Sequence, residues 1–318
     1  MKILIIGSGS VGIGIGTSLL SQETEVSFLA SKKTANEKKK SGIERTGLFT
    51  HYSFSPDEFK VYENYDELPD KEFDFIIISS KTTANRSIAK MLDKYRNILK
   101  DDFTILIIQN GFGNDEEYLK YFKTNQVYCA RIITGFRRPE RNISEVTVYT
   151  EPMLLGSLQN EDIAHLQIIA DKITSSGIKC ELTEEIDKYL WAKMLYNCAL
   201  NPLGAILDVT YGKLTENEYT KELMDNIIYE IFNVINASPY TTLWENADDY
   251  RKIFYEKLVP ETYGHYSSTH NDIKRKIKTE IDTLNGKVIE LGEKYGVDVK
   301  TNKIIYDLIK AIESDFSD

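Results

Sequence analysis

The stretch KILIIGSGSVG, residues 2–12, decides the fold. It begins with an unbroken apolar run closed by Gly7, a pattern typical of a parallel strand that is buried on both faces. Gly7, Gly9 and Gly12 follow in the spacing G-x-G-x-x-G, and residues 10–22 continue with a helical pattern. A strand, a glycine loop and a helix in this order predict a dinucleotide-binding unit.

The three glycines have separate tasks in such a unit. We expect Gly7 to allow the tight turn, Gly9 to let a pyrophosphate approach the backbone, and Gly12 to let the helix pack closely on the strand. Backbone N–H groups at the start of the helix then bind the phosphates. The alternative is a glycine turn that binds no ligand. The loop residues predicted to bind the cofactor are Gly7, Ser8, Gly9, Ser10, Val11 and Gly12.

Short apolar stretches alternate with helical patterns through the first half of the chain. Strands are expected at 25–29, 73–79, 104–108, 127–133 and 179–182, and helices at 84–99, 115–122 and 162–176. This alternation predicts an α/β fold with a doubly wound parallel sheet, the Rossmann arrangement.

The pattern changes after residue 182. Amphipathic helical patterns occupy 183–201, 219–237, 247–258, 271–295 and 303–314, and Thr183 is the expected N-cap of the first. We therefore predict a cofactor-binding domain over residues 1–182 and an all-helical substrate domain over residues 183–318. The lysine run at 38–40 is expected to lie on a solvated loop.

Composition excludes several classes of protein. The chain has 318 residues, of which 42% are hydrophobic and 28% charged, as is typical of a folded globular protein. Its net charge of −10 disfavours binding to nucleic acid or anionic lipid, and no apolar run is long enough to span a membrane. The 4 histidines and 3 cysteines lack metal-ligand spacing, so we expect no metal site. The odd number of cysteines and the absence of a signal-peptide pattern predict a reduced, cytoplasmic protein.

The second expected strand ends in the sequence LASKK, residues 29–33. NAD-binding sites usually carry an acidic residue here to hold the ribose 2′-hydroxyl, and this stretch has none. The hydroxyl of Ser31 and the ammonium of Lys32 can instead hold a 2′-phosphate by charge-assisted hydrogen bonds. The sequence therefore favours NADP(H) over NAD(H), with a merely solvated loop as the alternative.

Residues 190–206 read LWAKMLYNCALNPLGAI. In this stretch Lys193 is the only charged side chain, and Asn197 and Asn201 are the only carboxamides. Their spacing of four residues places them in one stripe of a helix whose other faces are apolar. A buried lysine must be paired or functional, so this stripe predicts a site. The alternative is a polar stripe on a surface helix.

Four other residues are weaker candidates on sequence alone. Lys81 and Asn110 each follow a buried strand, at the carboxyl edge where open α/β sheets bind ligands. Ser268 and Glu280 are expected before and on a long C-terminal helix, where a serine is most simply an N-cap and a glutamate most often faces solvent. A straight helix would separate these two residues by about 18 Å.

Taken in order, the motifs resemble those of the ketopantoate reductase (2-dehydropantoate 2-reductase) family. They are the N-terminal glycine loop, SKT, QNGFGNDE, WAKMxxNxxxNPL and SS…KTEIDxLNG, and they cover nearly the whole chain. The resemblance implies NADPH-dependent reduction of the 2-keto acid ketopantoate to pantoate, in pantothenate and coenzyme A biosynthesis. It implies a small-molecule partner and a monomer or homodimer.

The resemblance also implies roles for individual residues. Lys193 matches the family's general acid, and Glu280 matches the carboxylate that orients the lysine and the substrate. The remaining matches are substrate-binding positions at Asn197, Asn201 and Ser268, and positions at the nicotinamide and substrate edge of the first domain at Lys81 and Asn110. Because the resemblance brings Ser268 and Glu280 to one small substrate, it requires a break in the helix near Ser268.

This chain departs from the family pattern at Thr269–Asp272, and at Tyr211, where an asparagine is common. A reductase of a different 2-keto acid on the same scaffold is therefore one alternative. A sensor that binds NADP(H) without turnover is another. The retained Lys193 and Glu280 argue against the sensor.

Overall fold

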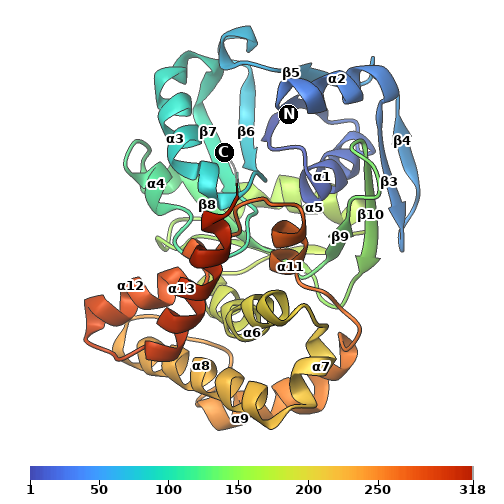
Figure 1. Cartoon of the computed structure of the whole chain (residues 1–318). Coiled ribbons are helices and arrows are strands. Elements are labelled where there is room, and N and C mark those ends of the chain that lie inside the picture. The colour runs from blue at the N-terminus through green and yellow to red at the C-terminus, as the bar shows by residue number, and fades with distance from the viewer. Residues whose placement is uncertain (317–318) are drawn as a thin grey trace. The chain divides into compact units, whose positions relative to one another are not determined.

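The structure is a computed structural model that describes residues 1–316 (Figure 1). Its internal contacts divide it into two compact units. The first comprises Met1–Gln109 and Asn114–Ile186, and the second comprises Asn110–Gly113 and the residues from Asp187 onward. The short segment Asn110–Gly113 thus groups with the helical unit, although it follows a strand of the first.

The first unit is built on an eight-stranded, mostly parallel sheet. The alternating pattern predicts six of its strands, but not those at Lys60–Tyr62 and Met153–Gly156. Every neighbouring pair of strands is parallel except β8 with β11, which is antiparallel. The strands, in order across the sheet, are β12 (Cys180–Leu182), β11 (Met153–Gly156), β8 (Val127–Arg131), β7 (Leu99–Ile107), β6 (Phe73–Ile78), β1 (Lys2–Ile6), β2 (Glu25–Leu29) and β5 (Lys60–Tyr62).

The first strand lies inside this sheet, third from the edge strand β5, where the strand order reverses. β1 pairs with β2 on one side and with β6 on the other, and its residues Ile3, Leu4 and Ile5 are fully buried. The carboxyl end of a strand at such a reversal is where open α/β sheets bind ligands. The glycine loop that follows β1 therefore opens at a binding position.

Helices cover this sheet. Figure 1 shows α3 and α1 beside the sheet at different places along it. The helices are α1 (Ser10–Leu20), α2 (Lys32–Ser41), α3 (Asn85–Lys94), α4 (Glu116–Leu119) and α5 (Gln167–Ser175). Short 3₁₀ turns are η1 (Tyr65–Glu67), η2 (Thr82–Ala84), η3 (Arg96–Ile98), η4 (Thr124–Gln126) and η5 (Ala164–Leu166).

A second sheet, which the sequence does not predict, packs on α1. Its order is β4 (Tyr52–Phe54), β3 (Ile43–Gly47), β10 (Ile143–Val148) and β9 (Gly135–Arg137). β3 pairs in parallel with β10, from about a hundred residues further along the chain. The Oγ atom of Ser144 in β10 donates a hydrogen bond of 2.7 Å to the carbonyl of Ser10, the first residue of α1. This sheet is thereby attached to the helix that begins at the glycine loop.

The second unit is helical, as expected, and in Figure 1 α8 runs beside α12 and α13, against which it packs. Its elements are α6 (Ile186–Leu207), α7 (Tyr211–Thr215), α8 (Glu218–Ala237), α9 (Ala247–Ile253), the π-helix η6 (Phe254–Leu258), α10 (Val259–Glu261), α11 (Ser268–Lys274), η7 (Ile281–Thr283), α12 (Asn285–Tyr295) and α13 (Lys300–Ser314). Within residues 1–316, no helix is both long and apolar enough to cross a membrane.

The single helix predicted over residues 271–295 is wrong. α11 ends at Lys274, and Lys276 adopts a left-handed backbone with a φ of 54°. Both the N–H and the hydroxyl of Thr279 then donate hydrogen bonds of 2.6 Å to the carboxylate of Glu313 on α13. A buried carboxylate thus binds backbone that helix hydrogen bonding would otherwise use, and the next long helix begins only at Asn285.

Two smaller predictions are also wrong. Thr183 is not the N-cap of the first long helix, because α6 begins at Ile186 and the Thr183 hydroxyl instead accepts the N–H of Glu185 in a local turn. Residues 38–40 do not lie on a solvated loop but form the end of α2, and the Lys38 side chain is 0% exposed.

Candidate functional site

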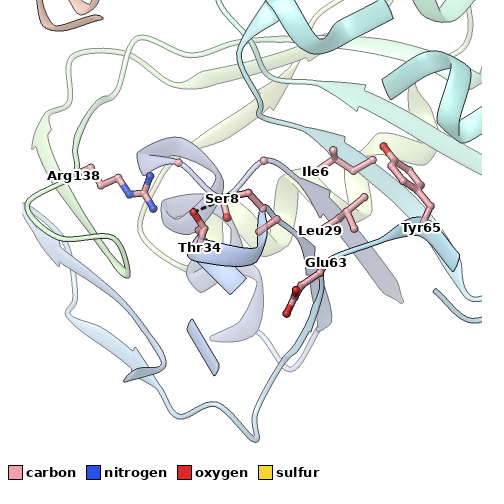
Figure 2. Close-up of a pocket in the computed structure, with 11 residues that line it drawn as sticks. Ile6, Ser8, Leu29, Thr34, Glu63, Tyr65 and Arg138 are labelled. Atoms are coloured by element: carbon pink, nitrogen blue, oxygen red, sulfur yellow. Dashed lines mark hydrogen bonds between the residues drawn. The ribbon is translucent and has the colours of Figure 1, made fainter. Parts of the chain in front are cut away.

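A pocket opens at the glycine loop of the first unit (Figure 2). Its walls come from the end of β1 and the loop, from the end of β2 and the start of α2, from the segment after β5, and from the turn after β9. The lining residues are Ile6, Gly7, Ser8, Gly9, Leu29, Ala30, Ser31, Thr34, Glu63, Tyr65 and Arg138.

The loop glycines occupy positions that suit a bound dinucleotide. A Cβ atom on Gly7, whose φ is +98°, would lie 2.3 Å from the backbone nitrogen of Ser80, so the turn itself requires glycine. A Cβ atom on Gly9 would meet no protein atom within 4 Å. The protein fold therefore does not explain Gly9, whereas a ligand lying against the backbone would. Ser10, Val11 and Gly12 form the first turn of α1.

The structure separates the two residues predicted to hold a 2′-phosphate. Ser31 lines the pocket, is the N-cap residue of α2, and donates a hydrogen bond of 3.3 Å to the hydroxyl of Thr34. Lys32 is exposed and is not among the lining residues. No acidic residue lies at the end of β2, but Glu63 after β5 lines the pocket and pairs at 3.1 Å with Lys39.

Sequence reasoning missed one cation in this pocket. Arg138 lies in the turn after β9, and Figure 2 shows its guanidinium pointing toward Thr34 and Ser8. Its Nη2 atom donates a hydrogen bond of 2.6 Å to the carbonyl of Arg141, which holds the side chain across the turn. No local pattern identifies this residue, because its place depends on the pairing of β10 with β3.

In the second unit the lysine of the predicted stripe forms a polar cluster. The Nζ atom of Lys193 on α6 donates a hydrogen bond of 2.5 Å to Oδ1 of Asn110. The Nδ2 atom of Asn110 in turn donates a long hydrogen bond of 3.5 Å to Oε2 of Glu280, which is 8% exposed. The structure thus brings together three predicted site residues from three distant segments.

Packing within the same unit fixes the position of Asn110. The ring of Phe112 lies 4.9 Å, between centroids, from both Trp191 and Tyr240. The N–H of Phe112 donates a hydrogen bond of 3.0 Å to the carbonyl of Thr283. Asn110 is therefore held between α6 and the segment that carries Glu280.

The two asparagines of the stripe are buried on α6, Asn197 being 8% and Asn201 4% exposed. The Oδ1 atom of Asn201 accepts a hydrogen bond of 2.7 Å from the hydroxyl of Tyr211. The backbone carbonyl of Asn201 accepts one of 3.0 Å from the hydroxyl of Ser267. Burial raises the pKa of Tyr211, so this hydroxyl remains a donor. Within residues 1–316 the side chain of Asn197 has no hydrogen-bond partner.

The remaining predicted residues lie as follows. Ser268 is exposed and begins α11, whereas the buried Ser267 is its N-cap and accepts the N–H of His270. Glu280 does not project from a long helix but lies just before η7. A substrate shared by Ser268 and Glu280 requires that the chain between them is not one straight helix, and the structure meets this requirement. The break, however, falls after Lys274 and not at Ser268. Lys81 lies in the first unit, at the N-cap of η2.

The cluster in the second unit has the chemistry of a proton donor. An ammonium group can stabilise negative charge that develops on an oxygen and can supply a proton to it. A nearby carboxylate favours the charged form of the lysine, and a carboxamide that accepts from the ammonium fixes its direction. No group of three or more His, Cys, Asp or Glu side chains able to hold a metal ion gathers among residues 1–316.

Known proteins match this chain along most of its length. Residues 3–160 match the family model described as ketopantoate reductase PanE/ApbA, and residues 185–313 match the model of its C-terminal domain. A 2-dehydropantoate 2-reductase of Aquifex aeolicus is 36% identical over 314 residues, which are 98% of this chain and 97% of that protein.

Solved structures share the fold at lower sequence identity. A ternary complex of D-mandelate dehydrogenase with NADH and anilino(oxo)acetate has a TM-score of 0.87 and 22% identity, covering 99% of both chains. A PanE/ApbA family ketopantoate reductase from Ralstonia eutropha has a TM-score of 0.86 and 22% identity, also over 99% of both chains.

Proposed function

This chain belongs to the ketopantoate reductase family, and from that premise we propose that it reduces ketopantoate to pantoate with NADPH. The family makes it an oxidoreductase; the substrate, the cofactor form and the residue roles are the proposal. The reaction would belong to pantothenate and coenzyme A biosynthesis, in the cytoplasm.

The pocket of the first unit fits a dinucleotide. The open space at Gly9 lets a pyrophosphate approach the backbone, and the first turn of α1 presents N–H groups to it. Gly7, Ser8, Gly9 and Ser31 are the predicted ligands that line this pocket. When bound, the reduced nicotinamide supplies the hydride.

Lys193 is proposed as the general acid. Addition of hydride to the keto carbon leaves negative charge on the carbonyl oxygen, which the Lys193 ammonium stabilises and protonates. Glu280 is proposed to keep Lys193 charged and correctly directed through Asn110, which bonds to both. The three-residue chain Lys193–Asn110–Glu280 is the one observation that carries the proposal.

The substrate contacts follow from the same helix. Asn197 and Asn201 offer carboxamides that bind hydroxyl and carbonyl groups without adding charge. Tyr211 leaves the Nδ2 group of Asn201 as a donor because it occupies only Oδ1. Ser268 is proposed to bind the substrate carboxylate from the start of α11, and its exposure is compatible with contact to a ligand.

The choice of NADPH rests on pocket residues and not on the fold. The D-mandelate dehydrogenase of similar fold was solved with NADH, so the fold alone does not select NADPH. Here the end of β2 lacks the acidic residue of NAD sites, and Ser31, Thr34 and Arg138 line the pocket nearby.

Steady-state kinetics with a panel of 2-keto acids tests the proposal. We expect the highest kcat/KM for ketopantoate with NADPH, and a lower value for smaller or aromatic 2-keto acids. A preference for another 2-keto acid would favour the second candidate, a different reductase on the same scaffold. Two observations favour this second candidate. The D-mandelate dehydrogenase of similar fold was solved with anilino(oxo)acetate, and this chain has Tyr211 where the family commonly has asparagine.

A further inference from the structure

The cofactor pocket has one strongly basic wall. Arg138 lines it, and the hydroxyls of Ser31 and Thr34 line the same region of α2. In Figure 2 the guanidinium of Arg138 points toward Thr34, whereas Glu63 and Tyr65 are drawn further from it than Ser8. A planar guanidinium beside two hydroxyls is a donor set suited to a phosphate group.

A second cation adds to this wall from inside the protein. Lys38, one turn after Thr34 on α2, is 0% exposed, and its Nζ atom has no hydrogen-bond partner among residues 1–316. Its Nζ atom lies 5.6 Å from the centroid of the Phe28 ring. Burial, and then repulsion from Arg138, lower the pKa of Lys38 to about 7. A buried ammonium near a guanidinium is costly unless an anion compensates the two charges.

The turn that carries Arg138 is fixed to the cofactor-binding helix. Ser144 on β10 bonds to the carbonyl of Ser10, and Phe136 on β9 packs so closely on α1 that a Cβ atom on Gly14 would lie 2.4 Å from its ring. The bond from Arg138 to the Arg141 carbonyl holds the guanidinium within the turn. The basic group is therefore held at a defined place beside the glycine loop.

We infer that Arg138, supported by the buried charge of Lys38, binds the phosphate on the 2′ position of the adenosine ribose, together with Ser31 and Thr34. The inference rests on the proposed NADPH-dependent function and names the residues that distinguish the two cofactors. It replaces the exposed Lys32 with a cation from a distant turn. The end of β2 is the usual position of the adenosine ribose, and Leu29, Ala30 and Ser31 line the pocket there.

Glu63 favours the opposite interpretation, a site for the 2′-hydroxyl of NADH. Its carboxylate also lines the pocket, and acidic residues near the ribose bind the 2′-hydroxyl of NADH. Lys39 compensates this charge with an ion pair of 3.1 Å. The inference therefore expects Glu63 to contribute little to the discrimination between cofactors.

Binding of two nucleotide fragments tests the site without any catalytic step. Calorimetry would compare adenosine 2′,5′-bisphosphate with adenosine 5′-monophosphate on the full chain. We expect the wild type to bind the bisphosphate at least about tenfold more tightly, as one or two charge-assisted hydrogen bonds provide. Arg138→Ala should lose most of this difference, and Lys38→Met part of it.

The neighbouring Arg137 offers a matched control. It is exposed and paired at 2.7 Å with Glu145, so Arg137→Ala should keep the full preference. A melting temperature close to that of the wild type shows that Arg138→Ala is folded, and Arg138→Lys, which keeps the charge but not the planar fork, should restore part of the preference.

Equal binding of the two fragments by the wild type would overturn the inference, as would a preference that survives in Arg138→Ala. A wild type that binds the monophosphate more tightly, and that loses this reversed preference in Glu63→Gln, would also overturn it, in favour of an NADH site. A chain that discriminates the fragments through Arg138 but reduces no ketopantoate would leave the inference standing and refute the proposed reaction.

Discussion

The Nζ atom of Lys193 lies 2.5 Å from Oδ1 of Asn110, although the two residues are 83 positions apart in the chain. Asn110 follows a strand of the first unit, yet its segment packs with the helical unit through Phe112 against Trp191. The lysine is therefore directed by a residue that a different part of the chain supplies. This contact gives the ammonium of Lys193 a fixed hydrogen-bond partner on a helix that is largely apolar.

Replacing Lys193 by methionine tests the proton donor. Lys193→Met keeps the length of the side chain and removes the ammonium. We expect kcat to fall about a hundredfold or more, since general acid catalysis and charge stabilisation are worth that much, while the Kd for NADPH stays close to the wild-type value. Lys213→Met, at an exposed lysine paired with Glu216, is the control and should leave kcat unchanged.

Replacing Glu280 by glutamine tests the positioning role of its carboxylate. The carboxylate favours the ammonium form of Lys193, so its loss lowers the lysine pKa, and the protonated acid is then lost at a lower pH. We expect kcat to fall about tenfold and the basic limb of its pH profile to move to lower pH. Asp282→Asn, at a surface carboxylate that pairs with Lys310, should change neither. An unchanged basic limb in Glu280→Gln would assign Glu280 a purely structural role.

Gly9→Ala separates cofactor binding from folding. The backbone at Gly9, with φ −75° and ψ −166°, suits any residue, and a Cβ atom there meets no protein atom. We expect a free energy of unfolding within about 0.5 kcal/mol of the wild type and a Kd for NADPH raised about tenfold or more. Gly264→Ala, also in open space, should alter neither quantity. Undiminished NADPH binding by Gly9→Ala would place the pyrophosphate elsewhere.

Lys38 makes the stability of the ligand-free protein depend on pH. The pKa of Lys38 is about 7 in the folded chain and 10.5 in the unfolded chain, so the unfolded state binds the proton more tightly. The resulting destabilisation is complete below pH 7 and disappears as the pH rises to 10.5. We expect Lys38→Met to be more stable than the wild type at pH 7, by at most about 5 kcal/mol, and equally stable near pH 10.5. Denaturant titrations at the two pH values, with the exposed Lys39→Met as control, measure this.

Local pattern predicts the main sheet and the glycine loop because buried parallel strands and their loops are short, contiguous and apolar. The strands β1, β2 and β6 lie where the sequence places them. The small sheet is not predictable in this way, since β3 pairs with β10 across about a hundred residues and its strands are short and half polar. The position of Arg138 in the pocket depends on that sheet, so the sequence does not predict it.

The lysine stripe was visible in the sequence because one charge in an apolar helix is unusual. The surroundings of Glu280 were not, because KTEIDTLNG contains good helix formers, and only the distant Glu313 carboxylate binds the Thr279 backbone and keeps the segment from continuing as helix. Lys38 was misjudged for a related reason. A lysine in a polar, lysine-rich stretch indicates solvent, and its burial results from packing of α2 against Phe28.

The most direct measurement counts NADPH oxidised and pantoate formed in one reaction with ketopantoate, using the wild type and Lys193→Met at equal concentration. The account predicts equal amounts of the two in the wild type, and a rate at least about a hundredfold lower in the variant under cofactor saturation. A wild type that binds NADPH but oxidises none with ketopantoate, or a variant that turns over at the wild-type rate, would contradict it.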